Sequence, residues 1–478
     1  MPNDSVLPLQ RITRLTLVLL LAVSLGCGLW ALAVSYQRTL IPHSVDYEEG
    51  NVLNAAVRIN HGLTPYPDPH GWPVVLNPYG PVPYYLIAVP VHFRGPSFAP
   101  ARMVMVIATA LGAVFIGLIL HHVTRSSLVA WTFGSMYVSF LLIQHWMPVL
   151  RVDLLGITIV LAGLYVFIAH PRWWWLAVVL FVAALFTKYS LLAGPAACFA
   201  YLLSQKDWKR ATQFNLLGVL LTVIAFALVQ WRTQGAFAFD MFGTHPDPYR
   251  FSHYLNLLVP LVLCNVVLVL LALAAVVRSS TLKHFDVLTW YLIFGLLASL
   301  TGGKLGSNEN HMLELAAIFC VNAGVAWKWL FDGTVARQAI AAVAALLMVV
   351  ILFGKTELMA PSTPKRGCLS AYDMVRWAPV EHFLSEDVGA LVTQGKTVEL
   401  SNPFVYAQLA KAGKLSDAEL QRRIRARYFG LLVLSGEKND ERWSADVQRA
   451  IDENYQLVGR FSCPLAGEVL LPRHLGDK

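Results

Sequence analysis

The chain has 478 residues, of which 56% are hydrophobic and only 14% are charged, and its mean hydropathy is +0.55. Soluble domains average about 25% charged residues, so this composition excludes an ordinary soluble protein and predicts a polytopic membrane protein. The formal net charge is +8, but Lys and Arg stand singly between apolar runs. That pattern is typical of membrane-protein loops and argues against nucleic-acid binding.

The first apolar run, Leu15–Val34, is long enough to cross a bilayer, because a spanning helix needs about 20 residues. Arg11 and Arg14 precede it, and the positive-inside rule therefore predicts a cytoplasmic N-terminus. No small-residue cleavage site follows the run, so we interpret it as an anchor and not as a signal peptide.

A long segment rich in Pro, Gly and Tyr follows, over residues 37–101, and we expect it to form the first outer loop. Within it, Pro83–His92 is apolar but too short to span, which predicts a juxtamembrane or re-entrant helix. Asp46, Glu48 and Glu49 crowd near its start, where mutual repulsion and partial burial would raise at least one pKa. Such a carboxylate could act as a general base towards a hydroxyl or bind a divalent cation; the alternative is a solvated acidic loop.

The body of the chain predicts a bundle of membrane helices. Ten further apolar runs follow the first: Met103–His121, Leu128–Gln144, Leu154–Ala169, Trp173–Phe186, Leu191–Leu203, Phe214–Val229, Tyr254–Val277, Phe285–Leu300, Met312–Phe331 and Ala339–Phe353. The total is about eleven spans, some of them short enough to need flanking residues. Threading them alternately keeps the basic turns on the cytoplasmic side and places the C-terminus outside. We therefore expect a membrane domain over residues 1–354.

Residues 355–478 predict a small α/β domain on the outer side. Apolar stretches alternate there with polar helical stretches, namely Phe429–Ser435, Gln456–Phe461, Asp417–Arg425 and Ala445–Asn454. Cys368 and Cys463 bracket the domain and would face an oxidising compartment, so a disulfide between them is a hypothesis.

Several charges interrupt or abut apolar runs on the predicted outer face. Besides the first-loop carboxylates they are Arg151, Asp153, Lys188, Lys304, Glu309 and Glu314. For each residue alone, a helix-end anchor or a local salt bridge is the plain interpretation. A charge at the bilayer centre costs at least about 2.5–3.5 kcal/mol, so such a set on one face indicates a site that handles an anion and a proton together. No Walker loop and no GxGxxG after a strand occurs, so nucleotide binding is not indicated.

These features together resemble the GT-C superfamily of integral-membrane glycosyltransferases, such as protein O-mannosyltransferases and the lipid A aminoarabinose transferase. The segments that carry the resemblance are Asp46-Tyr47-Glu48-Glu49-Gly50, Gly62–Tyr66, Asn77–Pro81, Arg151-Val152-Asp153, Thr187-Lys188 and Gly306–Glu314. The order of first span, acidic loop, juxtamembrane segment, multi-span body and outer C-terminal domain extends it over most of the chain.

The resemblance implies transfer of a monosaccharide, a hexose or a pentose, from a polyprenyl-phosphate carrier to a hydroxyl. It implies inversion and the periplasmic side of a bacterial inner membrane. A first-loop carboxylate would be the base, usually within an Asp-Glu pair. Here the alignment offers either Glu48 or Asp46 with Glu49, and we favour the second.

The resemblance also implies that basic residues hold the lipid phosphate, and the candidates are Lys188, Arg151, Lys304 and Arg58. Residues that would support the site or contact the acceptor are Asp153, Asn308, Asn310, Glu314 and Tyr79. No soluble nucleotide donor is required, the resemblance names no certain cofactor, a divalent cation is an alternative, and the acceptor could be a lipid, a glycan or a protein. The competing functions are a flippase or transporter of lipid-linked sugars, and a polymerase or ligase of undecaprenyl-linked glycans.

Overall fold

The computed structural model describes residues 6–243, 248–281, 284–304, 306–355, 370–435, 442–461 and 466–473. The helices, in chain order, are α1 (Val6–Thr39), α2 (Glu49–Asn60), α3 (Pro81–Arg94), α4 (Phe98–Thr124), α5 (Ser127–Ser139), α6 (Leu141–Trp146), α7 (Asp153–Ala169), α8 (Trp174–Leu185), α9 (Ala193–Ser204), α10 (Trp208–Arg232), α11 (Ala236–Ala238), α12 (Phe251–Cys264), α13 (Val266–Thr281), α14 (Val287–Ser299), α15 (Leu313–Phe331), α16 (Val335–Lys355), α17 (Ala371–Trp377), α18 (Val388–Thr393), α19 (Pro403–Lys411), α20 (Ala418–Arg425) and α21 (Ala445–Asn454). Short turns are η1 (Pro171–Trp173), η2 (Phe239–Gly243), η3 (Leu300–Gly303) and η4 (Glu309–Met312), and the strands are β1 (Phe383–Ser385), β2 (Leu431–Ser435), β3 (Tyr455–Phe461) and β4 (Gly467–Pro472). The hypothetical Cys368–Cys463 disulfide lies outside the described residues.

Every apolar run predicted to span is helical, and the chain is a multi-pass integral membrane protein. In the described part, five helices are long and apolar enough to cross a bilayer: Pro8–Thr39, Phe98–Thr124, Trp208–Arg232, Glu309–Phe331 and Val335–Gly354. α12 and α13 together form a sixth candidate but are bent by 97° at their junction. The remaining runs form helices shorter than the roughly 20 residues that a straight crossing requires, so about eleven crossings stay a prediction.

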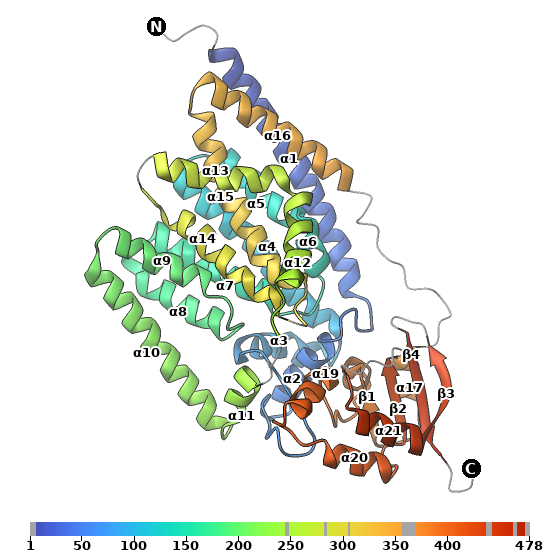
Figure 1. Cartoon of the computed structure of the whole chain (residues 1–478). Helices are drawn as coiled ribbons and strands as arrows, with labels where there is room; N and C mark the ends of the chain where they lie inside the picture. The colour runs from blue at the N-terminus through green and yellow to red at the C-terminus, as the bar shows by residue number, and fades with distance from the viewer. Residues whose placement is uncertain are drawn as a thin grey trace.

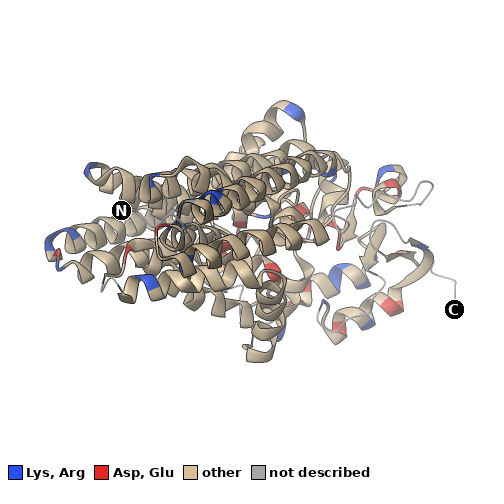
Figure 2. Ribbon diagram, turned by 90° about the horizontal axis from the view of Figure 1, so that it is seen from above, with Lys and Arg blue, Asp and Glu red and all other residues tan. Residues whose placement is uncertain are grey.

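Figure 1 shows that the chain begins at one end of the helical body, whereas the C-terminal sheet lies at the other end. α15 runs through the middle of the body and is almost wholly buried. It packs on α13, α14, α5 and α4. Figure 2 shows long uncharged stretches of helix, with many charged residues at helix ends and over the C-terminal part. This distribution is expected where the middle of the body faces lipid.

The C-terminal residues form the expected small α/β unit. Its four strands lie in the order β1-β2-β4-β3, with β1 parallel to β2 and the other pairs antiparallel. α21 matches the predicted helix Ala445–Asn454, and β2 and β3 lie at the predicted strands.

The loop over residues 37–101, predicted to be the first outer loop, packs together with the C-terminal unit beside the end of the helical body. The backbone N–H of Val74 donates to the carbonyl of Glu399 at 2.9 Å, and the carbonyl of Val74 accepts from Ser401 at the same distance. Where α2 crosses α18, a Cβ on Gly50 would lie 2.2 Å from the Gly389 nitrogen. Only glycine permits this approach, so the Gly50 that follows the carboxylates serves the docking of the C-terminal unit.

Candidate active site

A cavity of about 120 Å³ lies where the helical body, the first outer loop and the C-terminal unit meet. Its walls contain one carboxylate and three cations. The lining residues are Tyr47, Glu48, Pro78, Tyr79, Arg151, Lys188, Tyr189, Ser190, Thr301, Lys304, Gly306, Ser307, Asn310, His311, Asn402, Phe404, Val405 and Gln408. These residues come from four distant parts of the sequence, so only the tertiary fold creates the site.

Glu49 is completely buried, and both of its carboxylate oxygens are occupied. Oε1 accepts hydrogen bonds from Nε of Arg102 and from the backbone N–H of Leu150, each at 2.7 Å. Oε2 accepts from a second guanidinium nitrogen at 2.6 Å and from the backbone N–H of Val45 at 2.7 Å. Glu49 does not line the cavity, so the geometry does not favour our interpretation of Asp46 with Glu49 as the base. The Glu49–Arg102 pair instead ties α2 to α4.

Asp46 also faces a cation rather than the cavity. Its Oδ1 forms an ion pair with Nε of Arg151 at 2.9 Å, and its Oδ2 accepts a hydrogen bond from a terminal nitrogen of Arg151 at 3.5 Å. A terminal nitrogen of Arg151 donates to the Tyr79 hydroxyl at 2.9 Å. Asp46 and Tyr79 therefore hold the Arg151 guanidinium at the cavity wall, and burial raises the pKa of the Asp46 carboxyl.

Glu48 is the first-loop carboxylate that faces the cavity, and it is 2% exposed. Its Oε2 accepts from the side-chain amides of Asn402 at 3.1 Å and Asn51 at 3.3 Å. Its Oε1 is buried and has no hydrogen-bond partner among the described residues. Burial raises the pKa of Glu48 to about 7, although nearby Arg151 and the two amides favour the charged form. One oxygen is thus held in place while the other is open to a proton.

Lys188 is fixed by an ion pair with Oδ1 of Asp153, which also accepts from the Asn310 amide at 3.1 Å. Lys188 and Asn310 line both the main cavity and a smaller one of about 20 Å³, which Asp153 also lines. Glu314 lines that smaller cavity and accepts from the Tyr291 hydroxyl at 3.0 Å. The sequence-predicted residues Lys188, Asp153, Asn310 and Glu314 are therefore brought together.

The other predicted residues divide into two groups. Lys304 lines the cavity, and in the described part of the chain its side chain makes no hydrogen bond or ion pair. Asn308 does not line it; its side chain is exposed and accepts from the backbone N–H of Glu309 at 2.9 Å. Arg58 lies in the last turn of α2, away from the cavity, and donates to the carbonyl of Thr64 at 3.0 Å. Arg58 thus stabilises the loop.

Solved structures of two membrane proteins share this architecture. ArnT from Cupriavidus metallidurans superposes with a TM-score of 0.58 when bound to undecaprenyl phosphate, at 14% identity over 96% of this chain and 99% of that one. Its apo form gives 0.60 at 14% identity, over 95% and 97%. AglB, the oligosaccharyltransferase of Archaeoglobus fulgidus in complex with an inhibitory peptide and a dolichol-phosphate, gives 0.52 at 13% identity, over 95% and 75%. The chain has the GT-C fold. In sequence, no family model and no curated protein matches it.

Within this GT-C fold, the described residues show no group of three or more His, Cys, Asp or Glu side chains that could hold a metal ion. The open oxygen of Glu48 could serve as one oxygen ligand for a hard cation, but such a cation takes several ligands.

Two residues that contact the first-loop carboxylates, Arg102 and Asn402, were not predicted from the sequence. Arg102 abuts the apolar run of α4, the same signal that marks Lys188, and that signal could have identified it. No pattern in the sequence around Asn402 marks it as a site residue. It lies 354 positions from Glu48 in the sequence, and only the tertiary fold brings the two side chains together. At φ 51° it adopts a left-handed conformation and caps α19, with Pro403 next. This backbone turn aims its amide nitrogen at Glu48 while its oxygen accepts from Val405.

Proposed function

We propose that the chain is a membrane glycosyltransferase that moves a monosaccharide from a polyprenyl-phosphate carrier to a hydroxyl acceptor, with inversion at the anomeric carbon. The observation that carries this proposal is the unpartnered Oε1 of Glu48, in a carboxylate that shares one cavity with Arg151, Lys188 and Lys304. The carrier lipids bound in the ArnT and AglB structures support the choice of donor.

Glu48 is the proposed general base, in place of Asp46 with Glu49. Its pKa of about 7 suits proton removal near neutral pH, since a base works best when its pKa lies close to the working pH. As the acceptor oxygen attacks the anomeric carbon, its proton passes to Oε1 of Glu48. The bond from that carbon to the phosphate oxygen breaks on the opposite face, and the electron pair leaves with the phosphate.

Arg151, Lys188 and Lys304 are proposed to stabilise the departing polyprenyl phosphate. Arg151 and Lys188 each have a carboxylate partner that fixes their position, whereas Lys304 is the cation available to a ligand. When Glu48 accepts the proton, it becomes neutral and no longer offsets the positive charge of the three cations. Their full positive charge can then stabilise the negative charge that develops on the departing phosphate. Electrostatic stabilisation of this kind supplies a large part of enzymatic rate enhancement.

We further propose that the reaction occurs on the periplasmic side of a bacterial inner membrane, with the N-terminus cytoplasmic. The opposite placement of the N-terminus and the C-terminal unit supports this arrangement, as do the basic residues at the ends of the helices away from the cavity, such as Arg125 and Arg278. We retain the division into residues 1–354 and 355–478, but assign part of the site to the second unit through Asn402.

A polymerase or ligase of lipid-linked glycans is the second candidate, because the AglB fold also superposes. The cavity volume of about 120 Å³ lies well below the roughly 300–1,000 Å³ of sites for larger ligands. It therefore favours a compact donor head group such as a single sugar. A flippase would need the same charges but would form no new glycosidic bond.

The test is transfer by the purified chain from radiolabelled polyprenyl-phosphate monosaccharide to a membrane extract. We expect a labelled glycoside with wild type and with Glu309→Gln, which alters an exposed carboxylate outside the cavity. We expect Glu48→Gln to fold but to lose transfer by at least about 100-fold, the usual contribution of a general base. Full activity in Glu48→Gln would refute the base, and movement of label across vesicles without bond formation would favour the flippase.

A further inference from the structure

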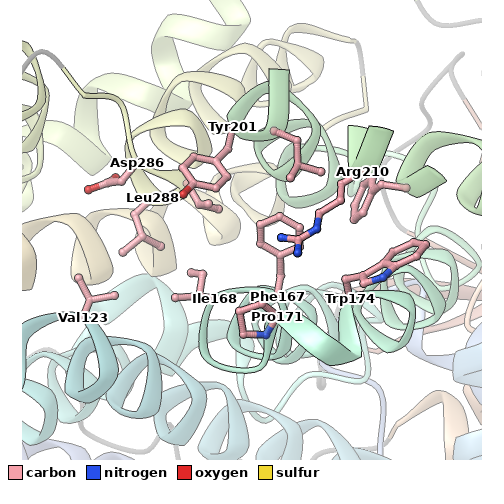
Figure 3. Close-up of a pocket in the computed structure, with 12 residues that line it drawn as sticks. Val123, Phe167, Ile168, Pro171, Trp174, Tyr201, Arg210, Asp286 and Leu288 are labelled. Atoms are coloured by element: carbon pink, nitrogen blue, oxygen red, sulfur yellow. The ribbon is translucent and has the colours of Figure 1, made fainter. Parts of the chain in front are cut away.

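A second cavity, of about 260 Å³, lies at the end of the helices opposite the candidate active site. Its walls come from the ends of α4, α7 and α9 and the starts of α8, α10 and α14. Figure 3 shows aromatic side chains around it, including Phe167, Trp174 and Tyr201. The Arg210 guanidinium reaches in among these rings. The cavity thus combines apolar walls with one cation at its mouth.

An apolar groove of about 430 Å³ lies next to this cavity, between α8, α9 and α10. Phe214 lines both spaces, so the two are adjacent. Apart from Asn215 and Thr222, the groove is lined by apolar residues. α10 closes it on one side and is itself largely exposed, with only Ala211 and Phe214 buried. The groove is therefore open to the hydrocarbon of the membrane.

The two charged residues that line the cavity, Asp286 and Arg210, differ in the number of hydrogen-bond and ion-pair partners that they already have. Asp286 accepts from Arg278 at 2.7 Å and from the backbone and hydroxyl of Thr289 at 2.9 Å each, so its carboxylate serves as the cap of α14. Among the described residues, the Arg210 side chain forms an ion pair only with Asp207, at 3.5 Å. Both members of that pair are substantially exposed, and such pairs contribute little. The cavity therefore offers a cation, but no uncommitted carboxylate for an ammonium group.

We propose that the cavity and groove bind an anionic glycerophospholipid of the surrounding membrane. Its phosphate lies on Arg210, and one acyl chain follows the groove past Phe214. An anionic head group fits better than a zwitterionic one, because Asp286 is already committed to Arg278 and Thr289. Basic pockets between membrane helices bind acidic lipid head groups in this way. This site is separate from the proposed transfer reaction and does not depend on it.

The proposal predicts selective binding of dioleoyl-phosphatidylglycerol over dioleoyl-phosphatidylcholine, measured by native mass spectrometry of the detergent-purified full chain. Arg210→Gln should weaken binding of the anionic lipid about fivefold and leave phosphatidylcholine unchanged. Lys209→Gln is the matched control, since it removes the same charge from a neighbouring exposed side chain outside the cavity. It should stay within about twofold of wild type at physiological salt, where the Debye length is about 8 Å.

A groove-filling variant tests the acyl-chain part. A Cβ on Gly218 would meet only Val178, at 3.7 Å, so Gly218→Leu should fold and should weaken both lipids by occupying the groove. Equal binding of the two lipids to wild type, or equal losses in Arg210→Gln and Lys209→Gln, would overturn the proposal in favour of diffuse surface attraction. Arg210-dependent binding of undecaprenyl phosphate but not of phosphatidylglycerol would also overturn it.

Discussion

Removing the Asn402 amide should make Glu48 a weaker acid. In the folded protein this amide donates to Oε2 of Glu48 at 3.1 Å and favours the charged carboxylate. Asn402→Ala deletes that donor but leaves the weaker bond from Asn51 at 3.3 Å. The pKa of Glu48, about 7 in wild type, should therefore rise.

The size of this rise follows from the strength of the bond. A hydrogen bond to a charged group contributes about 1.5–3 kcal/mol, and one pKa unit corresponds to about 1.4 kcal/mol. The Asn402 bond is long for a charge-assisted one, so the lower end applies, and we expect a rise of about one unit. Asn51→Ala should raise the pKa by a smaller amount.

A hydrophobic carbodiimide provides the assay, because it modifies protonated carboxyls and needs no sugar substrate. The extent of labelling at Glu48 itself would be measured across pH 5 to 10 by tandem mass spectrometry, which distinguishes it from the neighbouring Asp46 and Glu49. Labelling of wild type should fall to half near pH 7. The half-point of Asn402→Ala should lie about one unit higher, while Asn308→Ala, which does not contact Glu48, should match wild type.

Coincident labelling curves for wild type and Asn402→Ala would refute this reasoning, provided that both proteins unfold at the same temperature. A downward shift would also refute it, because it would mean that Asn402 favours the protonated form. Conversely, recovery of the wild-type half-point in Asn402→Gln would indicate that the donor itself, and not the shape of the residue, controls the pKa.

Three further predictions concern stability. Glu49→Gln leaves a fully buried guanidinium without its anion, so it should lower the free energy of unfolding by about 3–5 kcal/mol; wild-type thermal stability would contradict this. Gly50→Ala should expose the C-terminal unit to limited proteolysis, because its Cβ would lie 2.2 Å from the Gly389 nitrogen, whereas Gly26→Ala meets nothing within 4 Å and should resist digestion like wild type. Wild-type stability should decline from about pH 4.5 to about pH 7, since the folded state there keeps a Glu48 proton that the unfolded chain releases, and denaturant titrations should show a smaller decline in Glu48→Gln, where the Asp46 carboxyl still contributes.

Much of the fold follows from hydropathy and residue pattern. Each apolar run is helical, and α3, α21, β2 and β3 lie where alternation and helical spacing place them. The number of straight crossings could not be predicted, because helix lengths and the 97° bend between α12 and α13 depend on packing against neighbouring helices.

Part of the candidate site could also be predicted from local sequence, whereas the rest depends on the tertiary fold. Charges next to apolar runs identified Arg151, Lys188 and Lys304, since burial of a charge is costly wherever it occurs. The choice between Glu48 and Glu49 could not be made from adjacent positions in the sequence. It depends on Arg102, which occupies both oxygens of Glu49 and leaves Glu48 to face the cavity.

A structure determined with polyprenyl phosphate bound would test the proposed site most directly. We predict density for the phosphate between Lys304, Lys188 and Arg151, with the open oxygen of Glu48 facing the sugar position and the prenyl chain entering the membrane. Density for the phosphate remote from all three cations, with this cavity empty at saturating lipid, would contradict the proposed transferase.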